Sequence, residues 1–231
     1  MIVSITIVRY PKRYIPLAFF AMAIHRFPLW INKACTFWKL MGCGKNGTFD
    51  INPDYQQWGL FAVWKDEDDF RKFQNSSFIA KWWQKFTTEQ WTVLCEPVDA
   101  HGKWDGKEPF GKPKIKGHEG MVGVLTRATI RPSKLKNFWA NVPKVSAIMN
   151  SSQGFITSVG IGEAPFIRQA TFSVWNSLED VKKFAYRDKE HADVVKLTRS
   201  EDWYSEELFA RFRIISSEGT LMGKNPVAVG F

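Results

Sequence analysis

The chain has 231 residues, 45% of them hydrophobic, and is long enough to bury a core as two small domains or one fused unit. Its three cysteines form no CxxC pair, which excludes a disulfide framework and fits a reducing cytosol. The net charge of +9 suits nucleic acid, an anionic membrane or acidic ligands, and equally a scattered solubilising surface.

The first hundred residues predict the order strand, helix, strand, strand, helix, strand. Alternating β-branched residues at 1–10 predict a strand, which Pro11 ends. The remaining elements are predicted as a helix at 16–32, strands at 37–44 and 57–64, an amphipathic helix at 66–86 and a strand at 91–98.

An apolar run at residues 15–24 lies within the first predicted helix. It follows Lys12 and Arg13, as in a signal peptide, but a strand precedes it and no small-residue cleavage site follows. The run is also too short to span a bilayer. We therefore expect a cytoplasmic protein that contacts membranes only at its periphery.

The second half predicts the same order of elements. Its elements are strands at 120–131, 155–161, 167–175 and 208–215, with helices at 132–149 and 178–198. Residues 101–119, rich in Gly, Lys and Pro, are predicted to link the halves, and residues 216–231 to form a loosely ordered tail. We therefore predict an N-terminal repeat at 1–100, a linker at 101–119 and a C-terminal repeat at 120–231.

Local echoes support a duplication. Val63-Trp64 is repeated at Val174-Trp175, and Gly42-x-Gly44 at Gly160-x-Gly162, with offsets of about 111–118 residues. The β-α-β-β-α-β order in each copy is that of ferredoxin-like units. The predicted fold class is therefore α+β, with two ferredoxin-like units arranged as in the dimeric α+β barrel, a scaffold that does not by itself choose a function.

His191 is the histidine that best fits a ligand position. It lies inside the predicted helix 178–198, on one face with Phe184 and Val195, where the first copy has Ala80. A core-edge histidine bonded to a neighbour fits this pattern, and so does a metal ligand whose far nitrogen is bonded to Asp188 or a backbone carbonyl. Cys43 and His25 are weaker candidates, and His101 and His118 fall in the linker.

Four segments together resemble the spheroidene monooxygenase family over nearly the whole chain. They are residues 37–44 (FWKLMGCG), 102–110 (GKWDGKEPF), 190–192 (EHA) and 203–212 (WYSEELFARF). The resemblance implies haem, dioxygen chemistry and an apolar substrate, because the named members of the family oxidise acyclic carotenoids to ketones. It also implies that His191 is the axial ligand of the iron.

The resemblance leads us to expect a haem-dependent monooxygenase with non-covalent haem b. The chain offers aromatic walls, and Arg127, Arg131, Arg168 and Arg199 near element ends for the haem carboxylates, although a surface ion pair explains each arginine equally well. The expected partners are dioxygen, a ferredoxin-type electron donor and a membrane surface. A homo-oligomer is also compatible with the sequence.

Several alternatives remain open from the sequence alone. Other haem reactions on the same scaffold, such as aldoxime dehydration or peroxidase chemistry, need no reductase partner, and a haem carrier needs no catalysis. RNA binding would suit the element order and the positive charge. However, no strand has the Lys/Arg-Gly-Phe/Tyr pattern of RNA-recognition domains, so no nucleic-acid partner is expected.

Overall fold

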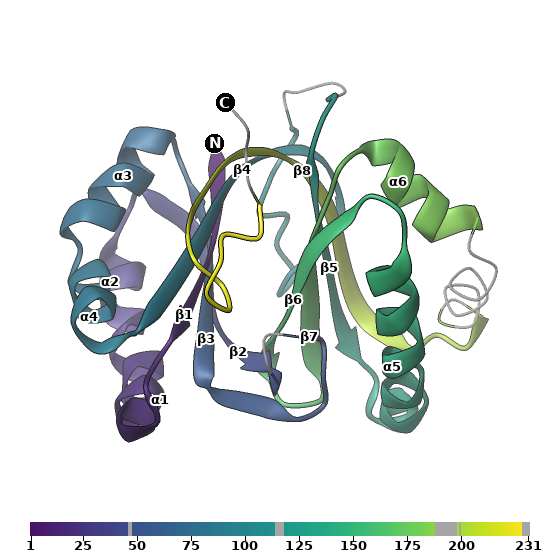
Figure 1. Cartoon of the computed structure of the whole chain (residues 1–231), viewed down its shortest axis with the longest axis horizontal. Coiled ribbons are helices and arrows are strands. Elements are labelled where there is room, and N and C mark those ends of the chain that lie inside the picture. Colours follow the sequence, from purple (N-terminus) through teal and green to yellow (C-terminus); the bar gives the residue numbers. More distant parts are fainter. Residues whose placement is uncertain (46–47, 114–117, 188–197, 199, 228–231) are drawn as a thin grey trace.

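Antiparallel strands close into one barrel, with helices on its two outer flanks (Figure 1). The structure is a computed structural model that describes residues 1–45, 48–113, 118–187, 198 and 200–227. The strand order around the barrel is β1-β3-β2-β6-β7-β5-β8-β4. Their bounds are Ile2–Arg9 (β1), Cys35–Gly44 (β2), Pro53–Trp64 (β3), Glu89–Gly102 (β4), Val122–Ile130 (β5), Phe155–Ala164 (β6), Arg168–Trp175 (β7) and Tyr204–Gly219 (β8).

Each half of the chain contributes four neighbouring strands, β4-β1-β3-β2 from the first and β8-β5-β7-β6 from the second. The halves join where β2 pairs with β6 and where β4 pairs with β8 over most of its length. The mixed class of helices and antiparallel strands is therefore as predicted. The strand order within each half is also the same.

The helices of the first half cover one flank and those of the second half cover the other (Figure 1). They are Ile15–Ile24 (α1), Arg26–Ile31 (α2), Glu67–Ser76 (α3), Phe78–Phe86 (α4), Leu135–Ser151 (α5) and Leu178–Lys182 (α6), which continues into a π-helical turn at Lys183–Arg187 (η4). The single helix predicted at 66–86 is wrong. Ser77 adopts an extended conformation and its side chain caps α4 by accepting from the Ala80 N–H, so the chain divides there.

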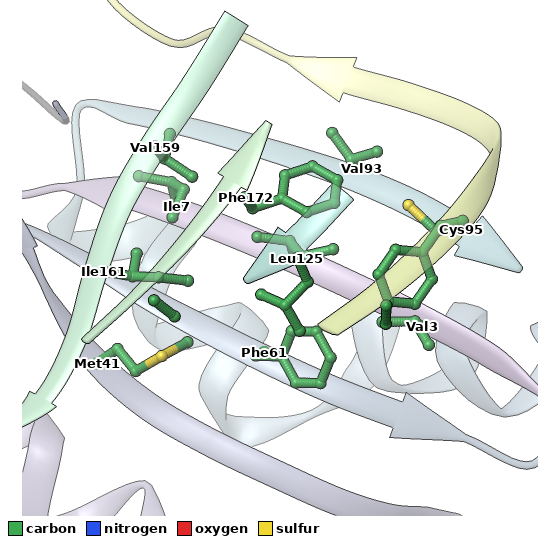
Figure 2. Packing of buried hydrophobic residues seen from close by; sticks show 14 of the residues in the cluster. Val3, Ile7, Met41, Phe61, Val93, Cys95, Leu125, Val159, Ile161 and Phe172 are labelled. Carbon is green, nitrogen blue, oxygen red and sulfur yellow. The ribbon is translucent and has the colours of Figure 1, made fainter. Parts of the chain in front are cut away.

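The barrel interior is a packed apolar core with contributions from both halves (Figure 2). Side chains alternate along each strand, so that one row points inward and the next outward. Inward-facing Phe61, Phe172 and Leu125 are fully buried. Cys43 belongs to this core, and burial raises the pKa of its thiol well above the usual range, which disfavours the thiolate needed to hold iron.

Two segments predicted to be irregular instead close the ends of the barrel. In the segment predicted as a linker, Trp104 and Phe110 are buried in the core, where both contact Phe61. In the predicted loose tail, β8 continues to Gly219, and Leu221 and Val227 reach the same core. The predicted linker does connect β4 with β5, but it also contributes to the core. The prediction of a loose tail was wrong, because Leu221 and Val227 are buried inside the barrel.

Candidate functional site

The outer faces of the two half-sheets differ at their centres. In the first half, Thr6 on β1 lies between Leu60 of β3 and Thr92 of β4 in the strand register. All three are buried, and the Thr6 and Thr92 hydroxyls are hydrogen-bonded at 3.0 Å. A continuous apolar layer that includes Trp64, Trp83 and residues of α1–α4 covers this face. No space for a ligand remains at its centre.

Among the described residues, the same position of the second half is less covered. Thr126 lies in the interior of β5, as Thr6 does in β1. Its side chain points outward, because the neighbouring side chains of Leu125 and Arg127 point into the barrel. It lies between Thr171 of β7 and Phe209 of β8. Thr126 is exposed and the other two are half-buried, so solvent reaches the centre of this sheet beneath the helices.

Two separate aromatic clusters border this opening, which we call the central gap. One cluster gathers Trp175, Phe184 and Phe209 around Met149. The other gathers Phe138, Trp139 and Trp203 around Ile130. Helix α5 contributes to both, and between its buried Val142 and Met149 it places half-exposed Val145 and Ser146. The gap thus has an apolar and aromatic rim with a floor of small polar side chains.

His191 and Arg199, two of the predicted cofactor residues, lie outside the described residues, as does Asp188. The described residues on either side of this stretch belong to the two aromatic clusters. Phe184, before that stretch, belongs to the first aromatic cluster, and Trp203, after it, belongs to the second. The turn that precedes it, η4, is π-helical, a geometry that occurs frequently at functional sites.

Of the other predicted cofactor residues, Arg131 is exposed and paired with Asp202 at 2.9 Å, whereas Arg127 and Arg168 lie at one end of the barrel. The Arg127 side chain is 1% exposed and its Nη1 donates to Glu206 Oε1 at 2.7 Å. Arg168 Nη1 lies 3.3 Å from Asp105 Oδ1. Both guanidinium groups therefore contact carboxylates, and Arg127 faces the opposite side of the sheet from Thr126.

These arginines belong to a network of alternating charges around the Trp104 plug. Lys39 forms ion pairs with Asp105 and with Glu163, the latter at 2.8 Å. The Trp104 indole N–H donates to Glu163 Oε1 at 2.5 Å. With Arg127, Arg168 and Glu206, the network contains three cations and three anions. Such a balanced cluster orients the plug and holds no net charge for a ligand.

Two carboxyl groups of this network have depressed pKa values. Burial opposes ionisation of Asp105, but the hydrogen bond and charge of Lys39 outweigh it and lower the pKa. Burial likewise opposes ionisation of Glu206, and the backbone N–H groups of Gly106 and Asp105 together with Arg127 lower its pKa. Both carboxylates are thus held ionised, as a structural network requires.

The sequence prediction missed this network, although three of the four segments that carry the family resemblance meet in it. Lys39 comes from residues 37–44, Asp105 from 102–110 and Glu206 from 203–212. Their spacing along the chain carries no signal, because pairing of strands from both halves brings them together. These segments therefore hold the barrel end closed, and the fourth lies outside the described residues.

The remaining histidines and cysteines form no metal site. Among residues 1–45, 48–113, 118–187, 198 and 200–227, no group of three His, Cys, Asp or Glu side chains could hold a metal ion. His25 is buried among Phe78, Trp82 and Trp83, and burial lowers its pKa to about 4. His101 stacks on Phe209 at the surface, and His118 is hydrogen-bonded to the Met121 carbonyl.

Comparison with known proteins decides the family. A model described as a domain of unknown function, DUF3291, matches residues 121–212. The spheroidene monooxygenase of Rhodobacter capsulatus is 34% identical over 209 residues, which cover 90% of this chain and 87% of that protein. The chain belongs to the spheroidene monooxygenase family. The resemblance recognised in the sequence is thereby confirmed.

Another member of the spheroidene monooxygenase family is longer than this chain. The enzyme of Cereibacter sphaeroides is 38% identical over 192 residues, which cover 83% of this chain and 59% of that protein. Among solved structures, an aldoxime dehydratase has a TM-score of 0.62 and 9% identity, over 96% of this chain and 84% of that chain. At this identity the likeness shows a shared fold alone.

Proposed function

We propose that this member of the spheroidene monooxygenase family is a haem-dependent monooxygenase that oxidises a long apolar substrate of the acyclic carotenoid type. One observation carries the proposal. Among the described residues, Thr126 is exposed and Thr171 and Phe209 are half-buried, whereas their first-half counterparts Thr6, Leu60 and Thr92 are buried. The fold as such does not require this opening, so its presence in one half only supports a binding function.

The described residues around the central gap fit a flat apolar group. Trp175 and Phe209 border one side, and Phe138 and Trp203 the other. The Trp203 indole N–H donates to Glu201 at 3.0 Å, and Glu201 is itself paired with Lys134. Such a slot excludes water from a bound macrocycle and leaves contact area for a long hydrocarbon.

We assign the axial imidazole to His191. It falls between Phe184 and Trp203, which lie on opposite sides of the gap. A neutral imidazole with its far N–H hydrogen-bonded binds iron well, and Asp188 is the nearest acceptor in sequence. Binding of haem carboxylates by Arg127, Arg168 and Arg199 stays a prediction, and the described contacts of the first two are with acidic side chains.

In the proposed reaction, haem held by His191 would supply the chemistry for reducing dioxygen and inserting one oxygen atom into a C–H bond of the substrate. The electrons come from a ferredoxin-type donor, and the second oxygen atom leaves as water. Two such hydroxylations at one carbon give a geminal diol, which loses water to form a ketone. The aromatic walls align the chain of the substrate and keep water away. Aldoxime dehydration and peroxidase chemistry proceed without that electron donor, so dependence on it separates the candidates.

Reconstitution with haem tests the site. The wild-type chain should give a Soret band, and His191→Ala should lose or shift it, while His101→Ala and His118→Ala keep it. Thr126→Phe should reduce haem affinity by about tenfold or more by filling the gap, and Thr126→Ser should not. A normal spectrum for both His191→Ala and Thr126→Phe would refute the proposed site.

The folding of Thr126→Phe serves as a further control. Circular dichroism and thermal unfolding of this variant should match the wild type, because the added ring enters open space. If haem binds equally well to Thr126→Phe while His191→Ala fails, the imidazole assignment holds and the central gap is the wrong location.

A further inference from the structure

The outer surface of α1 and α2 is unusually apolar. Phe27 and Trp30 are 64% and 73% exposed, and Phe19, Phe20 and Ile31 are also among the exposed large apolar residues. At 100° per residue these five side chains fall on one side of the helical segment. We call them the aromatic face. Contiguous exposed apolar patches of this kind mark interaction surfaces.

The inner side of the same segment carries smaller residues. Ala18, Ala21 and Leu29 are buried against the sheet. The segment therefore has its bulkiest apolar groups in solvent, the reverse of α3, which buries Phe70 and Phe73 and exposes charged residues. The apolar exterior of α1 and α2 thus contrasts with the charged exterior of α3.

The corresponding helix of the second half provides a matched comparison. Helix α5 follows β5 as α1 follows β1, after a similar 3-10 turn at Pro132–Lys134. Its exposed positions hold no large apolar side chain. They are Lys136, Asn137, Ala140, Pro143, Lys144, Ala147, Asn150 and Ser151. The fold therefore does not require an aromatic face at this place.

Cations flank the aromatic face, and no acidic residue balances them. The sequence contains no aspartate or glutamate before Asp50. Lys12 and Arg13 precede α1, Arg26 begins α2 and Lys33 follows it, and all four are exposed. Within the part of the chain that the structure describes, none of these four forms an ion pair with a carboxylate. They are available to an anionic partner.

The apolar surface extends around the end of the barrel. Phe19 contacts Tyr55 and Trp58 of β3, with ring centroids 5.8 and 5.0 Å apart. Tyr55 and Ile51, on and before β3, are themselves exposed. The surface is therefore broad enough to rest on a planar partner.

We propose that α1 and α2 dock the protein on an anionic lipid bilayer, with the aromatic face in the interface and the four cations at the headgroups. A helix with apolar aromatics and flanking basic residues is suited to lie in that interface, where Trp is favoured. A second copy of the chain would instead bring two sets of four unpaired cations together. A bilayer therefore matches both the shape and the charge of this surface better.

The segment lies on the bilayer and does not cross it. Residues 12–31 are long and apolar enough to span a membrane by length and composition. However, β1 ends just before the segment and β2 begins just after it, and both strands belong to the same barrel. A spanning arrangement would pull the barrel apart. Docking requires only the face that is already exposed.

Vesicle binding by the intact chain tests this inference without haem or substrate. Wild-type protein should co-sediment with vesicles of phosphatidylcholine and phosphatidylglycerol, and much less with phosphatidylcholine alone. Phe27→Ser combined with Trp30→Ser should lower the partition coefficient by at least about tenfold. Arg13→Glu combined with Arg26→Glu should do so at low salt, and the loss should shrink at high salt.

Matched controls fall on exposed sites elsewhere. Met222→Ser removes an equally exposed apolar side chain, and Lys112→Glu combined with Lys136→Glu reverses two exposed charges; both should bind vesicles like the wild type. Equal binding by the Phe27/Trp30 variant, or no binding by the wild type, would overturn the proposal. The proposal would also be overturned if size-exclusion chromatography showed a dimer for the wild type and a monomer for the Phe27/Trp30 variant, because the aromatic face would then join two copies of the chain.

Discussion

Replacement of Trp104 tests whether residues 103–113 are a plug of the barrel or a dispensable connection. The indole is fully buried, packs on Phe37 and Phe61 with ring centroids 5.5 and 5.2 Å away, and donates to Glu163. Truncation of a buried tryptophan to alanine costs about 3–5 kcal/mol. Trp104→Phe retains most of the packing and loses mainly the hydrogen bond, a cost of about 1–3 kcal/mol.

Urea unfolding followed by circular dichroism measures both effects. With a typical slope of about 2 kcal/mol per molar urea, Trp104→Ala should lower the midpoint by about 2 M and Trp104→Phe by about 1 M. Loss of less than about 0.5 M in Trp104→Ala would show that the segment contributes little to the closed barrel. The network around Arg127 would then need another explanation.

The other predictions concern titration of buried groups. His25 has a pKa lowered from 6.5 to about 4 by burial, so its contribution to stability is complete above pH 6.5 and is lost as pH falls toward 4, by about 3 kcal/mol. His25→Leu should flatten the dependence of the unfolding free energy on pH across that window, and an unchanged slope would contradict burial of the imidazole as its cause. Glu206→Gln removes the shortest ion pair of the buried Arg127, which keeps longer ones with Asp105 and Glu163, and should cost about 2 kcal/mol at pH 7. Because the pKa of Glu206 is depressed, its contribution is present above its usual value and is lost as pH falls through the lowered one. The difference between variant and wild type in urea unfolding should shrink over that range, and a constant difference would mean that charge is not its origin.

Much of the architecture was predictable from local pattern. The sequence pattern predicted a strand at each of the eight places, although β3, β4 and β8 extend further than expected. The echoes between Val63-Trp64 and Val174-Trp175 fall at equivalent ends of β3 and β7. Side-chain periodicity reports local geometry well because it depends on neighbours a few residues apart.

The candidate site was less accessible to sequence reasoning. The sequence predicts that Arg127 and Arg168 lie near strand ends. It does not predict their carboxylate partners, because Glu206 and Asp105 lie far from them along the chain. The sequence places Trp104 in a predicted linker, because glycine and lysine are frequent around it. In each case the deciding contacts join residues that are far apart along the chain, so local sequence spacing does not predict them.

Thr6 and Thr126 show which features follow from the sequence and which follow from the tertiary structure. The sequence by itself determined that each lies within a β-branched strand followed by a proline turn and a helix. Only the tertiary structure decided that Thr6 is buried under one continuous apolar layer, whereas Thr126 opens into a gap between two aromatic clusters. The alternation within a strand determines which side chains point outward. How completely these side chains are covered depends on helices from distant parts of the chain.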